Sequence, residues 1–223
     1  MYHPPAVFIG HFALGLAAKR ATPRVSLALL FGAAQLADIL WPVFLATGLE
    51  QVRIDPGNTA FTPLDFVSYP YSHSLVALCG WGLAFGAIYT VLRRARLSAF
   101  VTLALLVVSH WLLDFVTHRP DMPLYPGGAK FGLGLWNSVP ATVAIEVPLF
   151  AAGVWIYSRV THPRDRTGKW AFGSLIVTLL AIYAANILSP PPPSVPALTI
   201  VAIAGGVLFT AWSWWADAHR DVS

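Results

Sequence analysis

Apolar runs of about 20 residues recur along this chain and constrain its fold more than any other feature. An α-helix rises about 1.5 Å per residue, so such a run matches the hydrocarbon thickness of a lipid bilayer. Only 11% of the 223 residues are charged and 57% are hydrophobic, whereas soluble domains carry about 25% charged residues. We therefore predict an all-α fold, a polytopic transmembrane helical bundle that forms one integral membrane domain over residues 1–223.

Seven apolar segments are expected to form the helices of this bundle. They cover residues 6–18, 25–49, 72–92, 98–117, 136–157, 170–188 and 195–215. The first is short for a complete span. In the third, Ser72 is expected to cap the start of the helix, and the GxxxG pair Gly82 and Gly86 predicts a close contact with another helix.

Basic residues gather in alternate connections of the chain. The loops 19–24, 93–96 and 159–169 are strongly basic and Arg220 follows the last segment, whereas the loops 50–71, 118–135 and 189–194 are not basic overall. The positive-inside rule then predicts an N-out, C-in topology. The net charge of +4 and the pI near 9.5 are explained by loops that face anionic lipid, so the lipid bilayer is expected as a partner and nucleic acid is not.

Six ionisable residues interrupt or flank the apolar segments. They are His11, Asp38, His73, His110, Asp114 and Glu146. A charge at the centre of a bilayer costs about 2.5–3.5 kcal/mol on insertion scales, so such residues are candidates for function. The predicted topology places all six in the outer half of the bundle. His110 and Asp114, spaced i, i+4, share a helix face and can bind one ion or each other.

Any metal in this chain must be held by histidine and carboxylate groups, because Cys79 is its only cysteine. Mixed nitrogen and oxygen ligands suit a divalent metal such as Zn²⁺, with Mn²⁺ or Fe²⁺ as alternatives, rather than Ca²⁺. Such a metal lowers the pKa of bound water to about 7 and polarises a phosphoryl or carbonyl oxygen. His118, Asp121 and Glu146 are candidate catalytic residues. Glu146, just before Pro148, also remains a candidate ligand or helix-kink partner.

Several short motifs occur in an order that resembles a known family. They are Gly10-His11, Asp38, Ser72-His73-Ser74 and His110-x-x-x-Asp114-x-x-Thr117. Together they resemble the prokaryotic membrane-bound metal-dependent hydrolase family, multi-pass inner-membrane proteins with a distant similarity to zinc-dependent phospholipase C. The resemblance covers roughly residues 7–126. The chain reads Ala37-Asp38-Ile39-Leu40 where the family often has Pro-Asp-x-Asp, and it lacks one further histidine of the family pattern.

The resemblance implies a metal site and a reaction. The implied ligands are His11, Asp38, His73, His110 and Asp114, with residues 1–126 supplying the metal-site helices and outer loops and residues 127–223 mostly scaffold. The implied function is hydrolysis of a lipid or lipid-linked phosphoester near the outer leaflet of a prokaryotic inner membrane, with the site on the extracytoplasmic side. Two alternatives remain: a proton- or ion-coupled transporter, and a non-catalytic membrane scaffold with a structural metal.

Overall fold

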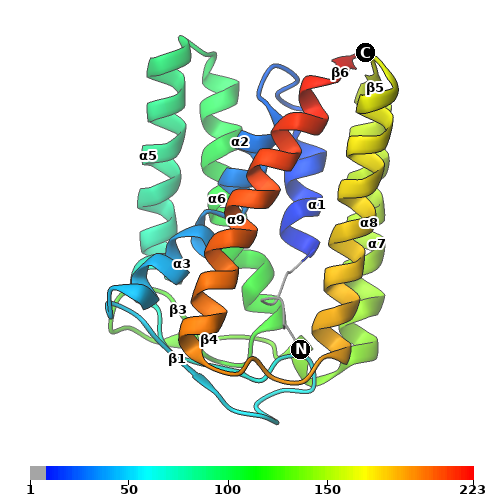
Figure 1. Cartoon of the computed structure of the whole chain (residues 1–223). Helices are drawn as coiled ribbons and strands as arrows, with labels where there is room; N and C mark the ends of the chain where they lie inside the picture. The colour runs from blue at the N-terminus through cyan, green and yellow to red at the C-terminus, as the bar shows by residue number, and fades with distance from the viewer. Residues whose placement is uncertain (1–8) are drawn as a thin grey trace.

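Long helices standing side by side make up most of the computed structural model, which describes residues 9–223 (Figure 1). Five are long and apolar enough to cross a membrane: α5 (Leu75–Arg93), α6 (Leu97–Thr117), α7 (Val139–Val160), α8 (Arg166–Leu188) and α9 (Val195–Ala218). This confirms a mostly helical fold and supports a multi-pass membrane protein. Residues 6–8 of the expected first segment lie outside the described residues.

The predicted number of seven spans is not confirmed, because the first two segments differ from the others. The first is α1 (Ile9–Ala18), a helix of 10 residues. The second segment was expected to be continuous but divides into α2 (Leu27–Ala34) and α3 (Leu36–Ala46), which meet at an angle of 59°. This bent pair counts as at most a sixth span by length and composition.

The bend between α2 and α3 occurs at Gln35, whose backbone has φ −105° and ψ 13°. Neither proline nor glycine is present at Ala34, Gln35 or Leu36, so no local breaker predicts the bend. A tertiary contact accompanies it, since the Ala34 carbonyl accepts a hydrogen bond from Nδ1 of His110 on α6 at 2.8 Å. The sequence pattern missed this break because its partner lies 76 residues away.

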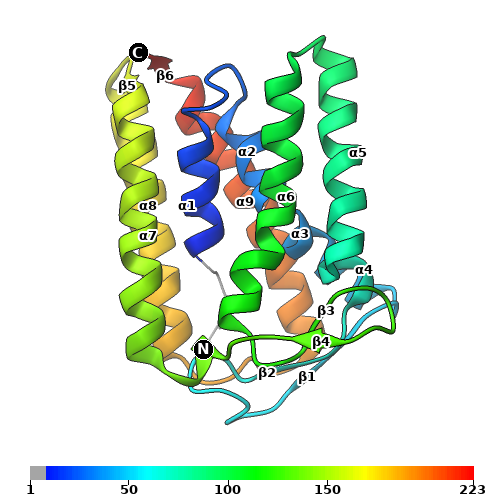
Figure 2. The ribbon, with the colours of Figure 1, turned by 180° about the vertical axis from the view of Figure 1, so that it is seen from behind.

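The connections collect at the two ends of the bundle (Figures 1 and 2). At one end, β5 (Thr161–Pro163) pairs with β6 (Arg220–Val222), and the α1–α2 and α5–α6 connections lie at the same end. At the other end lie β1 (Gln51–Ile54) with β2 (Leu64–Ser68), β3 (Met122–Pro123) with β4 (Lys130–Phe131), the short helix α4 (Pro70–His73) and the 3-10 turn η1 (Leu135–Asn137). The basic loops therefore share one end of the molecule.

Glycines allow the closest helix contacts. A Cβ atom on Gly82 would lie 2.8 Å from the Ala104 carbonyl oxygen, and one on Gly86 would lie 2.8 Å from the Phe100 oxygen. Both neighbours belong to α6, so the predicted GxxxG contact is confirmed as the α5–α6 interface. Gly153 of α7 approaches the backbone of α1 in the same way.

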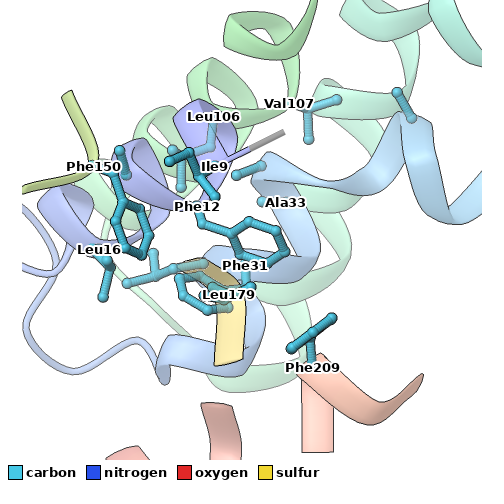
Figure 3. Close-up of a cluster of buried hydrophobic side chains, with 14 of the residues drawn as sticks. Ile9, Phe12, Leu16, Phe31, Ala33, Leu106, Val107, Phe150, Leu179 and Phe209 are labelled. Atoms are coloured by element: carbon cyan, nitrogen blue, oxygen red, sulfur yellow. The ribbon is translucent and has the colours of Figure 1, made fainter. Parts of the chain in front are cut away.

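The short helix α1 lies in the interior of the bundle. It packs against α2, α6 and α7, and its Ile9, Phe12 and Leu16 are at most 4% exposed. Figure 3 shows these side chains gathered with Phe31 and Phe150. Enclosure by other helices allows α1 to be shorter than the bilayer is thick, and it places His11 in the protein interior.

Candidate metal centre

All five predicted ligands come together near the β1–β4 end of the bundle. His11 lies on α1, Asp38 on α3, His73 on α4, and His110 and Asp114 on α6. Nε2 of His11 lies 3.1 Å from Oδ1 of Asp114, and Nε2 of His110 lies 3.2 Å from Oδ2 of the same residue. Nε2 of His73 lies 3.5 Å from Oδ1 of Asp38.

Among the described residues, two overlapping sets of three have the spacing of a metal site. One set is His11, Asp38 and His110, the other is His73, His110 and Asp114, and in each the ligand atoms lie within 4.8 Å of one another. His110 is common to both sets and stacks on His11 with ring centroids 3.8 Å apart. The two sets therefore describe one compact cluster.

The orientation of His110 is fixed from outside the cluster. Its Nδ1 contacts the Ala34 carbonyl, which can only accept a hydrogen bond, so this nitrogen carries the proton. In the neutral imidazole Nε2 then carries the lone pair, and it faces Asp38 and Asp114. This buried atom lies 3.2 Å from Oδ2 of Asp114 and 3.7 Å from Oδ1 of Asp38. A histidine held in this way is typical of a metal ligand.

His73 is oriented by a relay of two further residues. The Ser72 hydroxyl donates to Oε2 of Glu50 at 2.6 Å, so at 2.7 Å it accepts from Nδ1–H of His73. Oε1 of Glu50 also accepts from the backbone N–H groups of Tyr71 and Ser72, both at 2.8 Å. In the neutral imidazole, Nε2 of His73 then carries the lone pair, and this atom faces Asp38 of the cluster.

This relay corrects one prediction and adds one residue. Ser72 does not cap the third apolar segment, because α4 ends at His73 and the chain is extended at Ser74, whose hydroxyl caps α5 by accepting from the Ala77 N–H. The added residue is Glu50, which begins the loop 50–71, was not among the predicted site residues and is 2% exposed. No local sequence signal marks it, since its partners lie 21 and 22 residues away.

The donor set fits a divalent cation. It combines three imidazoles with two carboxylates, and His11, His73, His110 and Asp114 are at most 3% exposed. Two neighbouring carboxylates in a poorly solvated interior repel each other unless positive charge compensates them. A divalent ion would supply that compensation, with nitrogen and oxygen ligands of the kind that Zn²⁺ accepts.

The candidate residues His118 and Asp121 form a hydrogen-bonded pair at the end of α6. Nδ1 of His118 lies 2.9 Å from Oδ1 of Asp121, and the Tyr69 hydroxyl donates to the same oxygen at 2.8 Å. Burial, followed by the Asp121 charge, raises the pKa of Tyr69 well above its ordinary value, so Tyr69 remains a donor. Arg119 contacts both Asp121 and Asp65. Because Asp65 belongs to β2, Arg119 links the His118–Asp121 pair to this strand.

Glu146 lies apart from this group. Its fully buried carboxyl group lies beside the backbone N–H groups of Ile9 and Gly10. The start of a helix carries partial positive charge, so this contact stabilises the N-terminal end of α1. Among the described residues, Glu146 belongs neither to the two ligand sets nor to the lining of the adjacent cavity.

A cavity of about 270 Å³ adjoins the cluster. His11, Asp38, His73, Asp114 and His118 form its polar part, and the remaining wall is mostly apolar. The side chain of Asp38 is 39% exposed, in contrast to the 4% of Asp114. The cluster is therefore buried on the side of α1 and α6 and accessible on the side of Asp38.

Comparison of the chain with family models, curated proteins and solved structures finds no match. The fold and the site by themselves define the class, a multi-pass membrane protein with a buried histidine and aspartate cluster that could hold a metal ion.

Proposed function

We propose that this protein is a membrane-embedded, metal-dependent hydrolase that cleaves a phosphoester bond of a lipid or lipid-linked molecule. The observation that carries the proposal is the placement of five candidate ligands, two with their tautomer fixed from outside, beside a cavity that also contains His118. The resemblance to the membrane-bound metal-dependent hydrolase family supports the same reaction.

The five ligand residues would hold the metal, with zinc as the first candidate and manganese or iron as alternatives. When bound, it supplies Lewis acidity toward a phosphoryl oxygen and toward water. The outer contacts of His73 and His110 keep their Nε2 atoms aimed at one point. Because Asp38 is the most exposed of the acidic ligands, it borders the space that a substrate headgroup would occupy.

His118 is the best-placed general base of the three candidates. Asp121 accepts a hydrogen bond from Nδ1–H of His118. Nε2 of His118 can then take a proton from a water molecule in the cavity that this residue lines. The water oxygen then attacks phosphorus, the ester P–O bond breaks, and protonated His118 returns the proton to the leaving alkoxide. Tyr69 and Arg119 orient Asp121 and act through it. Glu146 acts as a helix-stabilising residue in this scheme.

The position of the cluster suggests a substrate in the outer leaflet. The cluster lies near the end of the bundle that carries β1–β4, opposite the end with the basic loops. With the basic end in the cytoplasm, the topology is N-out and C-in. The site then faces the extracytoplasmic side of a prokaryotic inner membrane, at the depth of lipid headgroups.

Metal content and hydrolysis, measured together on detergent-purified protein, test this proposal. We expect about one equivalent of zinc, manganese or iron in the wild type and none in H110A/D114A. S109A is the matched control, because within residues 9–223 the Ser109 hydroxyl bonds only to the Leu106 carbonyl of its own helix. Release of phosphate or a phosphorylated headgroup from lipid phosphoesters should follow the metal. Full metal occupancy in H110A/D114A, or none in the wild type after reconstitution, would refute the assignment.

A further inference from the structure

The cavity beside the candidate metal centre has a division of polarity that suits an amphiphile. Its polar part consists mainly of the histidine and aspartate residues already described, and Gln35, Trp41 and Thr210 add further polar groups to the lining. Away from them, the wall is formed by Phe31 of α2, Ile39 of α3, and Val201, Leu208 and Phe209 of α9. An anionic head and a hydrocarbon chain would each meet a matching surface in this space.

Small residues of α9 widen the apolar part. Ala202, Ala204, Gly205 and Gly206 all line the cavity. A Cβ atom on Gly205 would meet no atom within 4 Å, and one on Gly206 would meet only Cγ1 of Ile39 at 3.6 Å. No neighbouring helix packs closely against Gly205 and Gly206, in contrast to Gly82 and Gly86. The space beside them is therefore available to a ligand.

Two buried polar groups lack partners in the same lining. Nε1 of Trp41 and Oε1 of Gln35 have no hydrogen-bond partner among the described residues, although Trp41 is 6% exposed and Gln35 is 9% exposed. Buried polar groups are normally paired, so each of these two atoms indicates a missing partner. A ligand that carries both acceptors and a donor near its polar end, such as a hydroxylated or protonated phosphoester, would pair with them.

The α9 wall also adjoins the outer surface of the bundle. Ile203, Val207 and Leu208 are 41%, 67% and 51% exposed and are apolar. On a membrane-spanning helix such residues face lipid. Leu208 also lines the cavity, so the cavity reaches the lipid-facing surface of the bundle beside α9.

We propose that this cavity receives the first part of the hydrocarbon chain of an amphiphilic phosphoester whose head lies at the histidine and aspartate cluster. The proposal rests on the proposed function and specifies its substrate class. A volume of about 270 Å³ lies just below the range of about 300–1,000 Å³ of typical ligand pockets. Only the part of the chain next to the head fits, and the remainder extends into the bilayer.

Photo-crosslinking in lipid nanodiscs tests this chain position. The probe is a long-chain alkylphosphonate, which has a stable C–P bond and carries a diazirine on the chain near the head. We expect the wild type to be labelled in α9 and α3. G205L should reduce this labelling about tenfold, equivalent to about 1.4 kcal/mol, because the leucine occupies the cavity. Leucine also has a higher helix propensity than glycine, so the substitution does not weaken α9 locally.

G173L is the matched control. Gly173 is an exposed glycine of α8, also with no atom within 4 Å of a Cβ position, and it does not line the cavity. Labelling should be unchanged in this variant. A202L fills the same cavity one turn earlier on α9 and serves as a second test if G205L is not recovered as folded protein.

Metal content separates the two possible failures. Equal labelling of wild type and G205L, with metal bound in both, would overturn the chain site and leave the hydrolase proposal standing. Labelling spread evenly over the exposed faces of α5 and α8 would overturn it as well. A wild type that binds no metal would overturn the proposed function, and the chain site with it.

Discussion

Replacing Ser72 by alanine tests whether the outer contacts of His73 set the affinity of the candidate metal centre. Ser72 joins Nδ1 of His73 at 2.7 Å to the Glu50 carboxylate at 2.6 Å. S72A removes both hydrogen bonds, so the proton of His73 can move to Nε2, the atom that faces the cluster. The buried Glu50 carboxylate also loses one of its donors while keeping the two backbone N–H groups.

The expected loss follows from these two effects. Free choice between two tautomers costs about twofold in affinity, and a hydrogen bond to a charged group contributes about 1.5–3 kcal/mol. Loss of an outer-shell partner of a ligating histidine typically weakens binding about 10–100-fold, equivalent to about 1.4–2.7 kcal/mol. We therefore expect S72A to bind Zn²⁺ about 10–100-fold more weakly than the wild type.

Competition with a chromophoric zinc chelator measures this loss on purified protein. H73A removes the ligand itself and should weaken binding at least as much as S72A. S109A again provides a serine-to-alanine control that leaves the cluster's contacts intact. If S72A binds zinc within about twofold of the wild type while H73A does not, the tautomer of His73 is not fixed by Ser72, and the orienting role of the relay is wrong.

Three other predictions concern stability. G82A should be about 1–3 kcal/mol less stable than G80A, because a Cβ on Gly82 meets the α6 backbone while one on Gly80 meets nothing within 4 Å. The gain in helix propensity is common to both variants. Chemical unfolding in micelles measures the difference in their free energies of unfolding. A hydrogen bond from His219, and then one from the Gly168 N–H, lowers the pKa of Asp165 below its ordinary 3.8. The carboxylate therefore contributes stability above that ordinary pKa and loses it as the pH falls through the lower folded pKa, so D165N should melt below the wild type at neutral pH and approach it under acid conditions. Chelation should lower the Tm of the wild type and leave the Tm of H110A/D114A unchanged; an equal shift in both would show that the chelator acts elsewhere.

Local patterns in the sequence predicted those parts of the site that depend on spacing within one helix. His110 and Asp114 share a face of α6 by their i, i+4 spacing, and Gly82 with Gly86 marks the α5–α6 contact. The chemistry of isolated charges in apolar segments also singled out His11 and Asp38. These signals depend only on helix geometry and on the cost of burying charge, which the sequence specifies.

The missed features depend on contacts between distant segments. The bend at Gln35 lies where the Ala34 carbonyl bonds to His110, and the orientation of His73 depends on Glu50. The expected capping role of Ser72 was wrong because Ser74, two residues later, caps α5. α9, expected to be mostly scaffold, forms one wall of the cavity. Tertiary hydrogen bonds and packing determine these features, and they leave no periodic signal in the chain.

The origin of the cluster in four separate elements has a consequence for how the protein assembles. His11 and Asp114 meet across 103 residues of sequence, so a binding-competent centre exists only after α1, α3, α4 and α6 have come together. A metal at 100 times its dissociation constant stabilises such an assembled state by about 2.7 kcal/mol. The metal supply of the cell would then set the fraction of chains that persist as complete bundles, and chains starved of metal would be the ones exposed to membrane proteases.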